Sequence, residues 1–141
     1  MICDKLELKA GDRLLDIGCG WGGFAKYAAS TRGCEVTGIS LSDEQIRFAT
    51  DYTRGLPVTI RKLDYRDLPD SGLPPFDKVS IIGMIEHVGY KNYAGLMDVV
   101  HQMMKPDGLF PAAHDRQLRE DDGRRSLDRE VHLQRTRWCR R

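Results

Sequence analysis

The chain has 141 residues, of which 22 are lysine or arginine and 21 are aspartate or glutamate, so its formal net charge is only +1. This length allows one domain with a buried core, and the balanced charge gives no electrostatic reason to expect a nucleic-acid partner or an anionic membrane. The N-terminus has no basic segment followed by an apolar stretch, and no apolar run reaches bilayer length, so we expect a cytoplasmic protein with at most peripheral membrane contact.

Cysteine usage agrees with a cytoplasmic location. The four cysteines, at positions 3, 19, 34 and 139, have no paired spacing and no nearby histidine in a metal-ligand pattern. Reduced thiols are therefore expected, and no metal site is predicted.

Helical and strand patterns alternate from the start of the chain. A short helix is predicted over residues 2–9, and a strand follows over residues 13–17. A glycine cluster then opens a helix over residues 24–31. A second strand is predicted over residues 35–39.

The next helix has a recognisable start. Ser42 is a suitable N-cap with Gln45 three residues later, which predicts a helix that continues to about Thr53. Two further strands are predicted, over residues 57–63 and residues 76–83.

The last predicted elements are a helix and a short strand. The helix covers residues 93–104, and a turn over residues 105–108 leads to a fifth strand at Leu109. Regular alternation of strands and helices favours an α/β fold with a mostly parallel sheet and helices on both faces.

The composition changes after residue 110. Residues 1–110 contain seven lysines and six arginines, whereas residues 111–141 contain nine arginines, no lysine and few large apolar residues. We therefore divide the chain into a core over residues 1–110 and an Arg-rich tail over residues 111–141, which is expected to be disordered or irregular.

The glycine cluster after the first strand predicts a nucleotide-like ligand. Gly18, Gly20 and Gly23 match a G-x-G-x-x-G pattern, which by itself would also suit a dinucleotide-binding protein. A dinucleotide site, however, needs an acidic residue about twenty positions later to hold the ribose, and Ser40 occupies that place. Asp16 before the glycines instead fits a D-x-G-x-G arrangement, in which an acid sits beside the amino-acid end of S-adenosylmethionine.

Asp64 and Tyr65, directly after the third strand, extend this interpretation. The acid can accept from an adenine amino group, and the ring can stack on the base. Each residue also has an ordinary explanation: Asp16 as a turn residue, Gln45 as a solvated helix residue, Tyr65 as packing. Together they favour S-adenosylmethionine over a nicotinamide cofactor.

Five stretches carry a more specific resemblance. They are L-L-D-I-G-C-G-W-G-G-F at 14–24, V-T-G-I-S-L-S-D-E-Q at 36–45, D-Y-R-D-L at 64–68, F-D-K-V-S-I-I-G-M-I-E-H-V-G at 76–89 and K-P-D-G-L-F at 105–110. With these motifs the chain resembles the cyclopropane-fatty-acyl-phospholipid synthase family, which includes the mycolic acid cyclopropane synthases. The resemblance implies a Rossmann-like class I methyltransferase core, here incomplete at the C-terminus.

The family resemblance implies both a reaction and site residues. Members add the methylene of S-adenosylmethionine across a cis double bond in the acyl chain of a phospholipid or other lipid, and a bound bicarbonate removes a proton. A glutamate matching Glu86 helps to hold that bicarbonate and is the expected catalytic residue, whereas His87 is expected to be structural. The expected cofactor-binding residues are Asp16, Ile17, Gly18, Cys19, Gly20, Trp21, Gly22, Ser40, Leu41, Gln45, Asp64 and Tyr65.

The sequence also departs from the family pattern. Family members have an N-terminal helical region that supplies a bicarbonate-site cysteine, and this sequence lacks that region. The chain is therefore expected to be truncated at the N-terminus, and Cys3 does not replace the family cysteine. After Phe110 the family continues with a segment like Leu-Leu-His-Thr-Ile-Gly, which is absent.

Possible codons for residues 111–118, read one nucleotide later, permit that segment, and those for residues 127–134 permit Trp-Ile-Glu-Lys-Tyr-Ile-Phe. We therefore expect a shifted reading frame after Phe110, and His114 is not the family histidine.

Three functions follow from these observations. The first is a lipid-modifying methyltransferase of this family, impaired in the present chain. The second is a small-molecule N- or O-methyltransferase with the same core, and the third is a non-catalytic remnant that still binds the cofactor. The sequence leaves the acyl substrate and the oligomeric state open.

Overall fold

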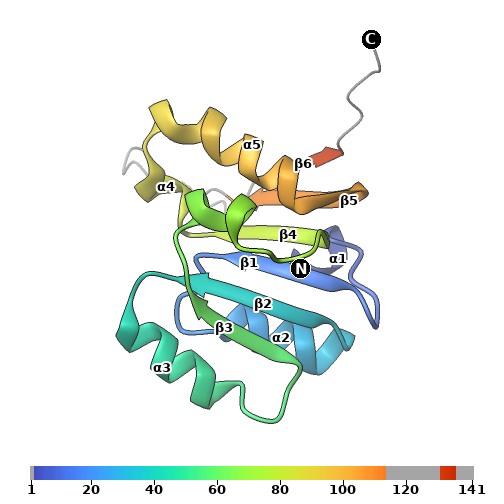
Figure 1. Cartoon of the computed structure of the whole chain (residues 1–141). Helices are drawn as coiled ribbons and strands as arrows, with labels where there is room; N and C mark the ends of the chain where they lie inside the picture. Colours follow the sequence, from blue (N-terminus) through green and yellow to red (C-terminus); the bar gives the residue numbers. More distant parts are fainter. Residues whose placement is uncertain (1, 114–130, 136–141) are drawn as a thin grey trace, which may run out of the picture.

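The structure is a computed structural model that describes the backbone of residues 2–113 and 131–135, with side chains over 3–84 and 87–110. One six-stranded sheet forms its centre (Figure 1). Its strands are β1 (Arg13–Ile17), β2 (Glu35–Ser40), β3 (Val58–Lys62), β4 (Phe76–Ile82), β5 (Met104–Ala113) and β6 (Val131–Arg135).

The strand order is β3-β2-β1-β4-β5-β6. β1 to β5 run parallel, and β6 is antiparallel to β5. The expected mostly parallel sheet is therefore confirmed. Strand order reverses between β1 and β4, which are neighbours in space although β2 and β3 separate them in the sequence.

Helices cover both faces of the sheet, as predicted. α1 and α2 enclose a cluster built on Leu14 and Val36, whereas η1 and α5 enclose a second cluster built on Leu15 and Phe76 on the opposite face. α3 lies beside β3 at one edge of the sheet (Figure 1). The helical bounds are α1 (Ile2–Lys5), α2 (Gly23–Arg32), α3 (Asp43–Tyr52), η1 (Tyr65–Asp70), α4 (Ile85–Val88), η2 (Tyr90–Asn92) and α5 (Tyr93–Met103).

β5 begins earlier than the sequence predicts. Residues 105–108, expected as a turn before the strand, lie within β5, which starts at Met104. Phe76 pairs with Met104 whereas Lys78 pairs with Leu109, so the additional residues form a bulge on β5. The turn-forming composition is therefore accommodated inside the strand.

The Arg-rich tail contributes two strand segments, which differ from the irregular chain that its composition predicts. Residues 111–113 extend β5, and residues 131–135 form β6. Strand pairing uses main-chain groups that every non-proline residue carries, whereas composition reports only on side chains. Residues 114–130 and 136–141 fall outside the described residues. No helix in the described part of the chain is long and apolar enough to cross a membrane.

Candidate functional site

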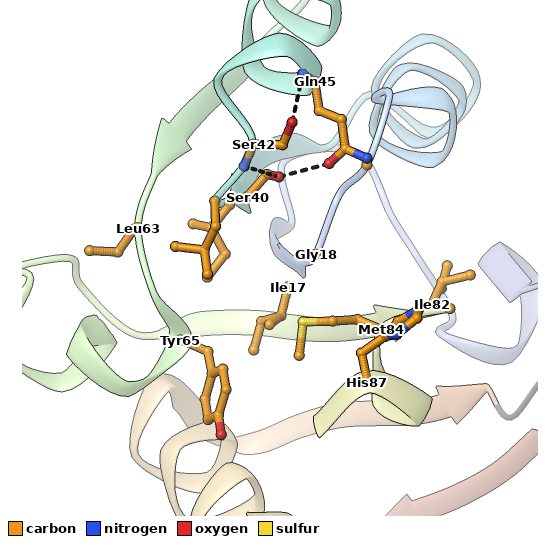
Figure 2. Close-up of a pocket in the computed structure, with 14 residues that line it drawn as sticks. Ile17, Gly18, Ser40, Ser42, Gln45, Leu63, Tyr65, Ile82, Met84 and His87 are labelled. Atoms are coloured by element: carbon orange, nitrogen blue, oxygen red, sulfur yellow. Dashed lines mark hydrogen bonds between the residues drawn. The ribbon is translucent and has the colours of Figure 1, made fainter. Parts of the chain in front are cut away.

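A cavity of about 420 Å³ opens at the edge of the sheet where β1, β2 and β4 end (Figure 2). In open parallel sheets, ligands bind at this edge, beside the point where strand order reverses. The cavity is lined by Ile17, Gly18, Gly20, Ile39, Ser40, Leu41, Ser42, Gln45, Leu63, Tyr65, Ile82, Gly83, Met84 and His87.

The turn after β1 brings the main chain to the cavity wall. Gly18 and Gly20 have φ angles of +76° and +54°, which L residues with a Cβ rarely adopt. A Cβ on Gly18 would lie 2.8 Å from the Cβ of Met84. The N–H groups of Gly18 and Cys19 both donate to the Ile39 carbonyl at 3.0 Å, which fixes the turn against β2.

Ser40, Ser42 and Gln45 form a hydrogen-bonded corner between β2 and α3 (Figure 2). Ser40 Oγ donates to Gln45 Oε1 at 2.9 Å, and Ser42 N donates to Ser40 Oγ at 3.3 Å. Ser42 caps α3, as predicted, by accepting from Gln45 N at 3.4 Å. This arrangement holds the Gln45 carboxamide at the cavity, where its amide nitrogen can donate to a ligand hydroxyl.

Tyr65 lines the cavity, but the neighbouring Asp64 has a different role in the structure. Asp64 begins η1 by accepting from Arg66 N at 2.9 Å, and it accepts from Arg66 Nε at 2.9 Å and Nη2 at 2.6 Å. Hydrogen bonding from the Arg66 guanidinium lowers the pKa of Asp64. Tyr65 and Leu63 pack against the apolar cluster of α5 and present a partly apolar wall to the cavity.

Asp16 is not among the residues that line the cavity. Its side chain is only 2% exposed and accepts from Ser80 Oγ at 2.8 Å. Burial raises the pKa of Asp16 to about 6, although the hydrogen bond from Ser80 acts in the opposite direction. The acid predicted beside the cofactor is therefore not among the lining residues, whereas the next residue, Ile17, is.

Trp21 extends outward from the glycine turn. Its side chain is 51% exposed, and its ring meets Phe48 of α3 edge to face with 5.4 Å between the ring centres. Phe48 in turn stacks on Tyr52 at 5.5 Å. The tryptophan thus joins the turn to α3 and is not among the lining residues.

The segment after β4 closes the opposite side of the cavity. Gly83, Met84 and His87 all line it, so His87, expected to be structural, lies at the cavity (Figure 2). The backbone of Glu86 lies in α4 between Met84 and His87. The side chain of Glu86 is outside the described part of the structure.

The structure brings together part of the predicted site. The predicted residues that line the cavity are Ile17, Gly18, Gly20, Ser40, Leu41, Gln45 and Tyr65, whereas those outside the lining are Asp16, Cys19, Trp21, Gly22 and Asp64. Sequence reasoning did not assign the remaining lining residues, which are Ile39, Ser42, Leu63, Ile82, Gly83, Met84 and His87. Ile39, Leu63 and Ile82 lie at or just after strand ends, which was the available signal for them.

These groups suit a nucleoside that carries a polar tail. The site offers the hydroxyl and amide groups of Ser40, Ser42 and Gln45, the aromatic ring of Tyr65 and the main chain of Gly18 and Gly20. Within residues 2–113 and 131–135, no group of three or more His, Cys, Asp or Glu side chains is arranged to hold a metal ion.

Comparison with known proteins identifies close relatives of this arrangement. A family model described as mycolic acid cyclopropane synthetase matches residues 1–135. The cyclopropane-fatty-acyl-phospholipid synthase of Escherichia coli (strain K12) is 51% identical over 110 residues, which are 78% of this chain and 28% of that protein. The chain therefore spans little more than a quarter of that relative.

Solved structures of the same kind share the fold. The cyclopropane synthase MmaA2 from Mycobacterium tuberculosis superposes with a TM-score of 0.71 at 27% identity, covering 78% of this chain and 39% of that chain. The mycolic acid cyclopropane synthase CmaA1, in complex with SAH and CTAB, gives a TM-score of 0.67 at 27% identity with the same coverage.

Proposed function

Because this chain belongs to the mycolic acid cyclopropane synthetase family, we propose that its cavity binds S-adenosylmethionine for one-carbon transfer to the acyl chain of a lipid. The single observation that carries the proposal is the combination of the glycine turn and the Ser40–Gln45 pair around one cavity. A similar structure, that of CmaA1, was solved in complex with SAH, which supports this class of ligand.

Particular residues fit particular parts of the cofactor. The Gln45 amide would hold the ribose hydroxyls, and the Tyr65 ring would face the adenine. The main chain of the glycine turn would accept the amino-acid tail, because Gly18 and Gly20 both line the cavity without a Cβ. The adjacent Gly20 supports this fit, since a Cβ built there would meet nothing within 4 Å.

The proposed reaction also needs a group that removes a proton. S-adenosylmethionine supplies a methyl group on a sulfonium, and its transfer to an alkene must be followed by loss of a proton from that methyl. We infer from the resemblance that Glu86 helps to hold the bicarbonate that takes this proton. The position of Glu86 between two cavity residues, Met84 and His87, supports this role. On this proposal the chain works in the cytoplasm, at the surface of the membrane that contains its substrate.

Calorimetric titration with S-adenosylhomocysteine tests the cofactor assignment. We expect saturable binding of S-adenosylhomocysteine and none of NADH, which lacks a sulfur-linked amino-acid tail. Adenosine serves as the control for the nucleoside half and should bind more weakly. No binding of S-adenosylhomocysteine by folded protein would refute the proposal.

A second assay tests the substrate class. Protein is incubated with labelled S-adenosylmethionine and vesicles of an unsaturated phospholipid, or with small amines and phenols, beside a full-length relative as comparator. Label in the lipid fraction supports the proposed lipid substrate, whereas label only in the small acceptors favours a small-molecule methyltransferase. Binding without transfer to either would leave a cofactor-binding module. Glu86→Gln should reduce lipid labelling by about a hundredfold or more and leave S-adenosylhomocysteine binding unchanged.

A further inference from the structure

Asp16 and Ser80 form a buried pair at the centre of the sheet. They are register partners on the neighbouring strands β1 and β4, and their side chains are 2% and 0% exposed. Ser80 Oγ lies 2.8 Å from Asp16 Oδ1 and 3.4 Å from the Leu15 carbonyl. The shorter contact identifies the carboxylate as the principal acceptor of the Ser80 hydroxyl.

The surroundings of Asp16 offer little else to stabilise a negative charge. Asp16 points to the same face of β1 as Leu14, which packs with the alanines of α2. Its partner on β2 is Gly38, and the Cys19 thiol lies over that glycine. Burial beside Asp16 raises the pKa of Cys19 to about 12, so this thiol remains neutral. Among the described residues, Asp16 has no arginine or lysine partner, which leaves the Ser80 hydroxyl as its stabilising contact.

Asp16 and Ser80 are close in the chain to residues that line the cavity. Asp16 directly precedes Ile17 and Gly18, and Ser80 lies two residues before Ile82. Ile17, Gly18 and Ile82 line the cavity, whereas Asp16 and Ser80 do not. A carboxylate at this depth is screened only weakly by water, so its charge acts strongly on a nearby cation. S-adenosylmethionine carries two cationic groups, a sulfonium and an ammonium.

We propose that Ser80 is a positioning residue that holds Asp16 in its ionised form and so sets the pH range over which the cavity binds its cationic cofactor. This inference rests on the proposed function and adds a regulatory property to the same site. It assigns no contact between Ser80 and the cofactor, because the hydroxyl acts through Asp16.

The direction of the effect follows from linkage between protonation and binding. A cofactor that prefers the ionised carboxylate binds more tightly as pH rises through the titration of Asp16 and reaches a plateau above it. Burial raises the pKa of Asp16 to about 6, so at about pH 5 the Asp16 carboxyl is ionised in only about a tenth of the molecules. The affinity for S-adenosylhomocysteine, which keeps the ammonium, is therefore expected to fall about tenfold between pH 8 and pH 5.

The test compares binding curves with a direct titration of the carboxyl group. Affinity for S-adenosylhomocysteine is measured by calorimetry from pH 5 to pH 8, and the Asp16 carboxyl carbon is followed by NMR without ligand. Ser80→Ala is expected to move both midpoints to higher pH. Asp16→Asn is expected to make the binding curve flat, with or without Ser80→Ala. Thr37→Val is the matched control, because it removes another buried hydroxyl from the sheet, from the strand face opposite Asp16.

Each outcome decides the question. Unchanged midpoints in Ser80→Ala, or a flat wild-type binding curve, would overturn the inference while leaving cofactor binding intact. Failure of folded wild-type protein to bind at pH 8 would instead count against the proposed function, and the inference would fall with it. Ser80→Cys, a weaker donor of similar size, replaces Ser80→Ala if the alanine variant does not fold, and the same shift is expected.

Discussion

Ser40 and Gln45 are joined by a 2.9 Å hydrogen bond across the corner where β2 ends and α3 begins. The bond fixes a flexible amide side chain before any ligand arrives, so less conformational entropy is lost on binding. A serine thus stands where a dinucleotide-binding protein would have a ribose-binding acid, and it acts by orienting the glutamine.

Replacement of Gln45 should weaken cofactor binding. Gln45→Ala removes the amide that we assign to the ribose hydroxyls, and a single hydrogen bond contributes about 1 kcal/mol, so about a fivefold to tenfold loss of S-adenosylhomocysteine affinity is expected. Glu44→Ala, at the neighbouring exposed position of α3, is the control and should bind normally. Equal affinities for the two variants in calorimetry would show that Gln45 does not bind the ribose.

Tyr65 should contribute through its ring rather than its hydroxyl. Stacking of a base on an aromatic side chain is worth about 1–3 kcal/mol, so Tyr65→Ala should weaken S-adenosylhomocysteine binding by about tenfold or more. Tyr65→Phe keeps the ring and should bind within about twofold of wild type. A large loss in the phenylalanine variant would show that the hydroxyl, not stacking, is the important group.

Gly18 should tolerate a side chain less well than another glycine of similar conformation. Gly18 and Gly11 have φ angles of +76° and +87°, but only a Cβ at Gly18 would approach Met84, at 2.8 Å. Gly11→Ala should therefore cost about 1 kcal/mol of unfolding free energy for its backbone alone, and Gly18→Ala about 1–3 kcal/mol more for the added overlap. Urea unfolding of both variants measures the difference, and equal losses would show that Met84 moves aside freely.

The buried carboxyl of Asp16 should make the wild type less stable, relative to an uncharged variant, as pH rises. Burial raises the pKa of Asp16 from 3.8 to about 6 in the folded chain. Compared with the unfolded chain, the folded chain therefore binds the Asp16 proton more tightly. The stability that this difference gives is fully present below pH 3.8 and is lost as pH rises through about 6. Asp16→Asn should gain up to about 3 kcal/mol over wild type between pH 4 and pH 7.

Urea unfolding at pH 4, 5, 6 and 7 gives this comparison directly. Other carboxyls titrate in the same range, but they cancel in the difference between the two proteins. A difference that does not change with pH would mean that Asp16 ionises normally in the folded chain.

The nucleotide sequence provides the check on the reading-frame hypothesis. Read one nucleotide later after the codon for Phe110, the gene is expected to encode a segment like Leu-Leu-His-Thr-Ile-Gly and, further on, one like Trp-Ile-Glu-Lys-Tyr-Ile-Phe. A gene without these segments in the shifted frame would dismiss the idea.

Local patterns were sufficient for most of the sheet. The predicted bounds of β1 to β4 agree with the structure within one residue at either end. β1, β2 and β4 are mostly buried and apolar, whereas β3 is an edge strand in which apolar Val58 and Ile60 alternate with more exposed residues. β6 was not predicted, since its pairing with β5 joins residues 18 or more positions apart and leaves no local period. The bulge in β5 was missed for the opposite reason: residues 105–108 have a strong turn composition, which pairing overrides.

Site residues could be predicted from the sequence where their position in the main chain places them at the cavity. They were harder to predict where the direction of the side chain decides. Gly18 and Ser40 follow from their places at strand ends, and both line the cavity. Leu63 and Met84 look like core residues in sequence, although they face the cavity. The outward turn of Trp21 depends on contact with Phe48, 27 positions away, which local sequence does not report.

The cavity lining has a consequence for the order in which the chain is made. Its first residue is Ile17 and its last is His87, so all of these residues are synthesised before β5, which begins at Met104. A ligand that binds this region can therefore stabilise the nascent chain while translation is still under way.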